Sequence, residues 1–140
     1  MRQVKLGIIG MGNMGSSHFK DIIAQEDCEI VVTAIADRID TKIESSKKCI
    51  ENHNAAHPER ALPMPATFSE GSDLIASGAC EAILIAVPHY DHTPISIDAF
   101  EKGLNVLCEK PLAVHVNDAN KSIDAFERAK NKNDKLVFAM

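Results

Sequence analysis

Apolar residues in this chain gather in short uninterrupted runs, separated by stretches in which they recur every three or four positions. The continuous runs are too short for helices and are typical of strands buried on both faces of a parallel sheet. We predict such strands, in chain order, at residues 4–9, 29–36, 81–87, 105–108 and 136–140.

Between the strands, the spacing of apolar residues predicts helices. The first opens in a glycine-rich run and ends near Gln25, and Asp40 is placed to cap a second. The segment 68–77 predicts a short element and one helical turn before Gly78. Residues 52–65 contain three prolines and no periodicity, which predicts an irregular surface segment.

Two further helices follow in the second half of the chain. Thr93 and Pro94 are a good N-cap and first helical residue, and Gly103 is placed to end that helix. Asn117 is placed to cap the last helix, whose inward side chains are expected to be Ala119, Ile123 and Phe126.

Strands that alternate with helices through short connections predict βαβ units. Right-handed crossovers then favour a doubly wound parallel sheet in three layers, an α/β fold formed by residues 1–140 as one domain. The composition agrees: 140 residues are 45% hydrophobic but only 4% aromatic, so the core must consist mainly of Ile, Val, Leu and Ala.

Charge and composition exclude several classes of protein. The net charge is −5 and no basic block is present, which argues against nucleic acid as a partner. The longest nearly apolar stretch, residues 82–88, is far shorter than the roughly 18 residues of a membrane helix, so no membrane contact is expected. The four cysteines form no C-x-x-C pair, which predicts reduced thiols in a cytoplasmic protein and no metal site.

A glycine motif follows the first strand directly. Gly10, Gly12 and Gly15 have the spacing G-x-G-x-x-G between a predicted strand and a predicted helix. In this context the first glycine permits a tight turn, the second lets the backbone approach a pyrophosphate, and the third lets the helix pack closely. The amides near Asn13, at the positive end of the helix dipole, would then face the phosphates.

An acidic residue completes the pattern. Asp37 follows the second strand, where a carboxylate accepts hydrogen bonds from the ribose hydroxyls of a dinucleotide. Its charge favours NAD over NADP as the cofactor, because it repels a ribose 2′-phosphate. Arg38 leaves this choice open, because a guanidinium can stack on adenine or bind that phosphate. Met11 and Met14 either line the pyrophosphate crevice or only fill space.

The second half of the chain carries a more specific signal. The segment VPHYDHTP follows the strand 81–87, and Glu109-Lys110-Pro111 follows the next strand. Both segments are expected at the ligand-binding edge of the sheet. Pro111 disfavours helical geometry at Lys110, which is therefore presented to the crevice. A lysine there can donate to a substrate hydroxyl.

With these motifs, and with GLNVLCEKPLA at residues 103–113, the chain resembles the glucose–fructose oxidoreductase, inositol dehydrogenase and rhizopine catabolism (Gfo/Idh/MocA) family. The resemblance implies an NAD(P)-binding Rossmann domain and hydride transfer at a hydroxyl or keto carbon of a sugar, cyclitol or related small molecule. It implies that Lys110 is the catalytic lysine near the nicotinamide and that Glu109 helps to hold the cofactor ribose. Pro88, His89 and His92 would line the nicotinamide side.

The same resemblance implies a substrate domain after the cofactor domain, with a proton-transferring histidine beyond Met140 and oligomerisation of the full-length protein as a homo-oligomer. We therefore expect residues 1–140 alone to bind cofactor without turning over substrate. The alternative is a non-catalytic nucleotide-sensing or regulatory protein with the same fold, which a chain complete at residue 140 would favour.

Overall fold

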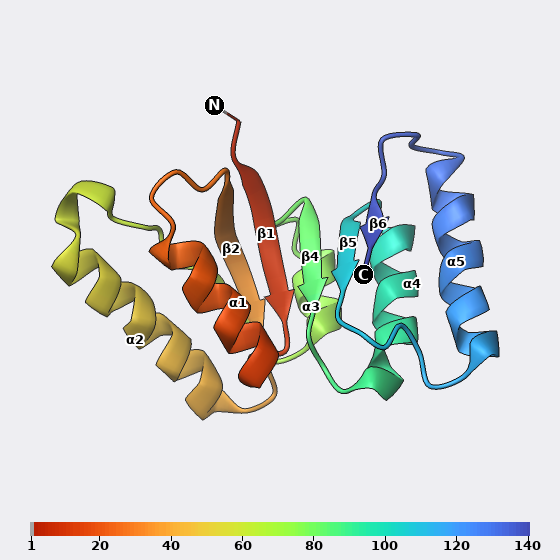
Figure 1. The fold of residues 1–140 in the computed structure, drawn as a ribbon, viewed down its shortest axis with the longest axis horizontal. Helices are drawn as coiled ribbons and strands as arrows, with labels where there is room; N and C mark the ends of the chain where they lie inside the picture. The colour runs from red at the N-terminus through yellow and green to blue at the C-terminus, as the bar shows by residue number, and fades with distance from the viewer. Residues whose placement is uncertain (1) are drawn as a thin grey trace.

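The sheet contains six parallel strands in the order β3-β2-β1-β4-β5-β6. The computed structural model describes residues 2–140 (Figure 1). The strands are β1 (Val4–Ile9), β2 (Ile30–Ala36), β3 (Ala66–Phe68), β4 (Ala82–Ile85), β5 (Asn105–Cys108) and β6 (Phe138–Ala139). The chain starts in the middle of the sheet, winds outward to β3, and then returns past β1 to wind outward to β6. This order confirms the predicted doubly wound Rossmann fold.

Helices cover both faces of the sheet. On one face, α1 (Asn13–Ala24) and α2 (Asp40–Ala56) pack over β1 and β2 (Figure 1). On the other, α3 (Gly71–Ala76), α4 (His92–Glu101) and α5 (Val116–Lys130) enclose a second hydrophobic cluster. Two short 3-10 turns, Pro58–Arg60 and His89–Asp91, complete the regular structure. The fold therefore has the three layers that the sequence predicts.

The strands in the middle of the sheet are buried on both sides. Ile8, Ile35, Ile83 and Ile85 are each 0% exposed, and burying a side chain of this kind stabilises a fold by about 1.5–3 kcal/mol. Successive residues of a strand point to opposite faces, so a continuous apolar run serves both clusters. Because these strands need apolar side chains on both faces, the continuous apolar runs in the sequence predicted the positions of β1, β4 and β5 well.

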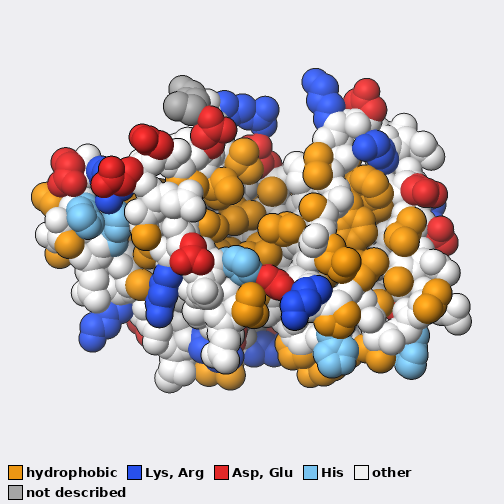
Figure 2. All heavy atoms as spheres, viewed as in Figure 1, with side chains coloured by type: hydrophobic (Ala, Val, Ile, Leu, Met, Phe, Trp, Pro, Cys, Tyr) orange, Lys and Arg blue, Asp and Glu red, His pale blue; other side chains and the backbone are white. Residues whose placement is uncertain are grey.

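One face of the sheet is left partly uncovered near its β6 edge. Leu107 on β5 is 45% exposed, and Val137, next to β6, is 56% exposed. Figure 2 shows apolar side chains gathered over this part of the sheet, between α1 and α5 of Figure 1. The opposite face is closed here by Phe100, Phe126 and Phe138, whose rings lie 4.9–5.6 Å apart.

The segment after α2 differs from the prediction. Helix α2 continues to Ala56, so the expected irregular structure at residues 52–56 is wrong. The prolines begin only at Pro58, and nothing before that position stops the helix. Asn54 orders the chain beyond it, because its side chain accepts from the Leu62 amide at 2.7 Å and donates to the Leu62 carbonyl at 2.9 Å.

Several predicted helix starts are displaced by one or two residues. Helix α2 begins at Asp40 itself, α4 begins at His92 after a 3-10 turn, and α5 begins at Val116. At none of these three starts does an N-cap side chain form a capping hydrogen bond. The prediction that Asp40, Thr93 and Asn117 are the N-cap residues is therefore wrong in position. Buried Ser122 and Ala125 form the inner face of α5, whereas Ile123, predicted to point inward, is 40% exposed.

Candidate functional site

A large open cleft lies at the carboxyl ends of β1, β2 and β4 and has a volume of about 880 Å³. The chain reverses its winding direction between β1 and β4, and ligands bind at such switch points in doubly wound sheets. The glycine loop, the turn after β2, the start of α3 and the segment after β4 form its walls. Of the predicted site residues, Gly10, Gly12, Asn13, Met14, Asp37, Arg38 and Pro88 line it.

The glycine loop has the geometry that its spacing predicts. Gly10 has φ +94°, and a Cβ there would lie 2.6 Å from the Ala86 carbonyl oxygen. A Cβ on Gly15 would lie 1.8 Å from the Gly10 carbonyl oxygen, so this glycine lets α1 pack against the loop. Beside Gly12 the nearest atom is Lys42 Nζ at 3.9 Å, which leaves the backbone open to the cleft.

Helix α1 starts at the floor of this cleft. Gly12 is its N-cap residue and provides no side-chain hydrogen bond to the first turn. The Ser16 hydroxyl, which lies close by, donates instead to the Met11 carbonyl oxygen at 2.8 Å. The first amides of the helix are therefore not covered by a capping side chain, and a helix start of this kind attracts anions such as phosphate.

Asp37 is held firmly between the glycine loop and α2. Its Oδ2 accepts from the Met11 amide at 2.8 Å, and its Oδ1 accepts from the Ile39 amide at 2.8 Å. Lys42 Nζ lies 3.9 Å from Oδ2, and the Asp37 side chain is only 10% exposed. A carboxylate oxygen accepts more than one hydrogen bond, so the group remains able to accept from a ligand hydroxyl in the cleft.

Arg38 is paired with an acidic residue that sequence analysis missed. Its guanidinium donates from Nε and Nη2 to the carboxylate of Glu70, with distances of 3.0–3.1 Å. This hydrogen bond and the attraction between the charges raise the pKa of Arg38 above its ordinary value. Glu70 precedes α3 and lines the same cleft, so both charges lie at the β2 end of the cleft.

The segment after β5 lies along the same edge of the sheet. The Glu109 amide donates to the Ile85 carbonyl oxygen at 2.9 Å, which continues the pairing of β5 with β4. Lys110 is exposed, and the peptide bond between Lys110 and Pro111 is cis. His18 Nε2 on α1 lies 2.5 Å from Glu109 Oε1. This contact is the main reason why the pKa of Glu109 lies below its ordinary value.

His92 occupies a different place from the one we predicted. Its ring is 1% exposed, with Nδ1 2.8 Å from the Pro111 carbonyl oxygen and Nε2 2.9 Å from the Val87 carbonyl oxygen. Almost none of the ring is open to a ligand, so His92 is not placed to contact the cofactor directly. The imidazole instead joins the segments that follow β4 and β5, where Pro88 and Pro111 have no amide hydrogen to offer.

The remaining predicted site residues do not line the cleft. The Met11 side chain is 2% exposed and packs in the core with Phe19, so it fills space and does not line the crevice. His89 is exposed in the 3-10 turn after β4, and neither it nor Glu109 or Lys110 is among the residues that line the cleft. Sequence analysis missed Lys42, because a lysine on a helix carries no signal of its own.

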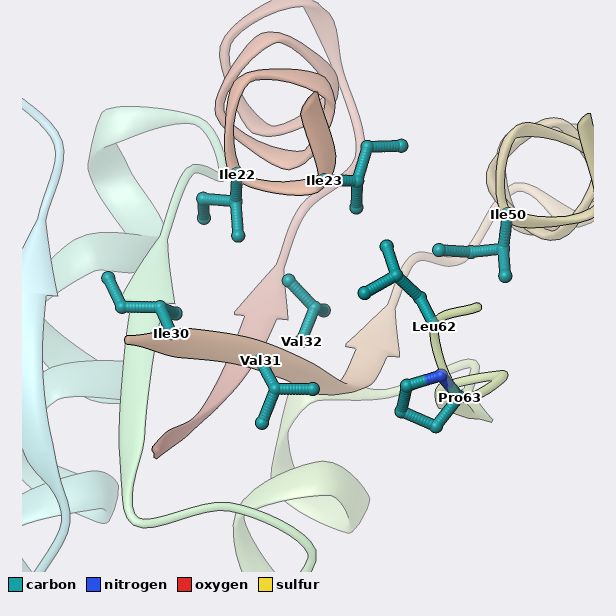
Figure 3. Close-up of a pocket in the computed structure, with 8 residues that line it drawn as sticks. All are labelled: Ile22, Ile23, Ile30, Val31, Val32, Ile50, Leu62 and Pro63. Carbon is teal, nitrogen blue, oxygen red and sulfur yellow. The ribbon is translucent and has the colours of Figure 1, made fainter. Parts of the chain in front are cut away.

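A second pocket lies elsewhere, between α1, α2 and the start of β2 (Figure 3). Its volume is about 20 Å³, close to the space of a single water molecule. Figure 3 shows only aliphatic side chains and a proline around it: Ile22, Ile23, Ile30, Val31, Val32, Ile50, Leu62 and Pro63. We interpret it as a packing defect and not as a ligand site.

No group of three His, Cys, Asp or Glu side chains is arranged to hold a metal ion within residues 2–140. Within the same residues, no helix has both the length and the apolar character that crossing a bilayer requires.

The fold and the cleft together define a dinucleotide-binding Rossmann domain. Residues 4–134 match the model of the oxidoreductase family with an NAD-binding Rossmann fold, Gfo/Idh/MocA. The chain belongs to this family, and it is an NAD-binding domain of that type.

Individual relatives agree with this assignment. The chain is 30% identical over 130 residues to the rhizopine catabolism protein MocA of Rhizobium meliloti, covering 93% of this chain and 36% of that protein. It is 32% identical over 111 residues to inositol 2-dehydrogenase of Corynebacterium glutamicum, covering 79% and 29%. This chain thus spans about a third of the length of these relatives.

A solved structure shows the same fold. Scyllo-inositol dehydrogenase from Lactobacillus casei, determined with NAD(H) and scyllo-inositol bound, matches 98% of this chain with a TM-score of 0.75. The identity is 20%, and the match covers 35% of that chain.

Proposed function

We propose that this chain is the cofactor domain of an NAD-dependent oxidoreductase that acts on a hydroxyl or keto carbon of a sugar, cyclitol or related small molecule. The observation that carries the proposal is that three features lie at the same edge of the sheet. The uncapped start of α1 and the Asp37 carboxylate lie at the cleft where a dinucleotide binds to a Rossmann fold, and the segment Glu109–Pro111 follows β5 at the same edge of the sheet. Relatives named as inositol dehydrogenases support the substrate class.

The residues of the cleft fit NAD. The open backbone beside Gly12 and the first amides of α1 would hold the pyrophosphate. Asp37 would accept from the hydroxyls of the adenosine ribose, because its two oxygens are already oriented by the Met11 and Ile39 amides. We favour NAD over NADP, since this fixed negative charge disfavours a phosphate on the same ribose.

When bound, NAD would supply the hydride-transfer chemistry, in either direction between an alcohol carbon and a carbonyl carbon. The chain's own residues position the reactants. Lys110 is exposed at the end of β5, and its ammonium group would bind the reacting oxygen of the substrate. Glu109 would bind the nicotinamide ribose, and His18 would orient its carboxylate.

We propose that the longer protein has a second domain that supplies the substrate pocket and the catalytic base. The curated relatives described above are about three times as long as this chain. The apolar side chains left exposed near the β6 edge, Leu107 and Val137, are suited to cover by further structure.

Isothermal titration of the 140-residue chain with NAD and with NADP tests the binding step. We expect heat of binding with NAD and weaker binding of NADP; no heat with either at millimolar ligand would overturn the proposal. A nucleotide sensor would also bind NAD, so a second measurement is needed. In the longer protein, K110M should lower kcat/KM by about 100-fold or more while the Kd for NAD changes little.

A further inference from the structure

Four charged side chains surround the β2 end of the cleft. Asp37, Arg38, Lys42 and Glu70 all line it, two negative and two positive. They form two pairs: Lys42 Nζ lies 3.9 Å from Asp37 Oδ2, and Arg38 donates to Glu70 over 3.0–3.1 Å. Each of the two cations therefore already has a carboxylate partner, and Asp91 and Asp98, which also line the cleft, add further negative charge.

The two pairs differ in how firmly they are held. Asp37 is fixed by two backbone amides and is 10% exposed. The Arg38 and Glu70 side chains are 77% and 45% exposed and come from different strand ends, 32 positions apart in the chain. Glu70 is the hydrogen-bond partner of the guanidinium, so removing the charge of that carboxylate frees Arg38 from this pair while leaving Asp37 in place.

A freed guanidinium would change which ligand the site accepts. Arginine binds phosphate through two parallel hydrogen bonds, the same geometry that it makes here with Glu70, where Nε donates to Oε1 and Nη2 to Oε2. Glu70 and a ribose 2′-phosphate would therefore compete for one group. The Glu70 carboxylate also repels such a phosphate directly, because both are anions at the same end of the cleft.

We propose that Glu70 is a specificity-determining residue, which occupies Arg38 and so keeps the site selective for a dinucleotide whose adenosine ribose carries free hydroxyls. This inference rests on the proposed function and extends it. Asp37 alone makes the site unfavourable to a 2′-phosphate, and Glu70 occupies Arg38, the more exposed of the two cations that would offset this effect. The residues Asp37 and Arg38 by themselves leave the choice between NAD and NADP open. In this proposal, the pairing of Arg38 with Glu70 decides that choice in favour of NAD.

The test compares the Kd values of NAD and NADP for the 140-residue chain and its variants, measured by isothermal titration at one salt concentration. E70Q keeps the side-chain shape but removes the charge. We expect the ratio of the NADP Kd to the NAD Kd to fall about threefold to fivefold in E70Q, the upper part of the range for one exposed charge pair. The double variant E70Q/R38Q should return the ratio to within about twofold of the wild type, because the phosphate-binding group is gone.

E44Q is the matched control. Glu44 lies on α2, is 68% exposed and pairs with Lys47, and it does not line the cleft. The same loss of one negative charge there should leave the ratio unchanged, which separates a local effect from one of net charge. An equal fall of the ratio in E44Q and E70Q would overturn the inference.

The outcomes also separate this inference from the proposed function. If NAD binds the wild type but E70Q has the wild-type ratio, Glu70 does not set specificity and the cofactor assignment stands. If E70Q/R38Q keeps the lowered ratio, Arg38 is not the group that Glu70 occupies, and the inference is wrong. If neither dinucleotide binds any variant, the proposed function fails and the inference fails with it.

Discussion

His18 on α1 and Glu109 after β5 are 91 residues apart in the chain, yet Nε2 of the one lies 2.5 Å from Oε1 of the other. Their side chains are 36% and 18% exposed, so solvent reaches the pair only in part. The contact spans the switch point between β1 and β4, because α1 follows β1 directly and Glu109 follows β5. It connects the helix that begins at the glycine loop with the segment that carries Lys110.

This pair predicts a dependence on pH. The hydrogen bond from His18, and next its charge, favour the ionised form of Glu109 and lower its pKa below the ordinary value of about 4.5. A carboxylate of lowered pKa contributes stability above its unfolded pKa and loses it as the pH falls through the folded pKa. H18A should therefore raise the pKa of Glu109 and destabilise the chain at pH 7 more than below pH 4.

The measurement is an NMR titration of the Glu109 side-chain carboxyl carbon in the wild type and in H18A, with urea unfolding at the two pH values. H115A is the control, because His115 is exposed before α5. An unchanged midpoint for Glu109 in H18A would show that the pair does not form in solution.

His92 predicts a loss of stability. Replacing it with Leu removes the ring nitrogens that contact the carbonyl oxygens of Val87 and Pro111, at a position that is 1% exposed, and so leaves a buried carbonyl without its N–H donor. We expect H92L to lower the free energy of unfolding by about 2–4 kcal/mol. H89L, in the exposed turn next to it, should change it by about 0.5 kcal/mol or less. Urea denaturation followed by circular dichroism measures both, and equal effects would contradict the account.

Two glycines of the loop are expected to have different roles, Gly15 in folding and Gly12 in NAD binding. G15A places a Cβ 1.8 Å from the Gly10 carbonyl oxygen and should cost about 3 kcal/mol of stability or more. G12A meets nothing closer than 3.9 Å and should cost about 1 kcal/mol at most. Its Cβ nevertheless fills the approach to the backbone, so we expect NAD affinity to fall about tenfold or more.

Unfolding curves and NAD titrations of the two variants check this prediction. A G12A chain that binds NAD as tightly as the wild type would show that the ligand does not approach the backbone at this glycine.

Local patterns predicted much of the fold and of the site. β1, the glycine loop, α1 and Asp37 follow one another within a single βαβ unit, so spacing alone placed them. Residues 52–56 were predicted wrongly, because a polar helix end has no apolar periodicity and the following prolines obscured it. The strand β3 has only three residues, and the short element predicted at residues 68–77 overlaps it only at Phe68.

The partners of the site residues were beyond sequence analysis for another reason. Glu70 meets Arg38 across 32 residues, and His92 meets Pro111 across 19. Such contacts depend on the strand order and on the turn geometry at the sheet edge, which one sequence does not specify. For His92 the consequence was a wrong role: a histidine beside a predicted crevice indicated a ligand contact, but its ring is buried and joins two segments of backbone.

The most direct test of the central claim is an amide NMR titration of the 140-residue chain with NAD. The account predicts the largest shifts at the Gly12, Asn13 and Met14 amides and near Asp37, all at the cleft. It predicts small shifts at Ile50 and Leu62, beside the minor pocket. No shifts at millimolar NAD, or shifts confined to residues outside the cleft, would contradict it.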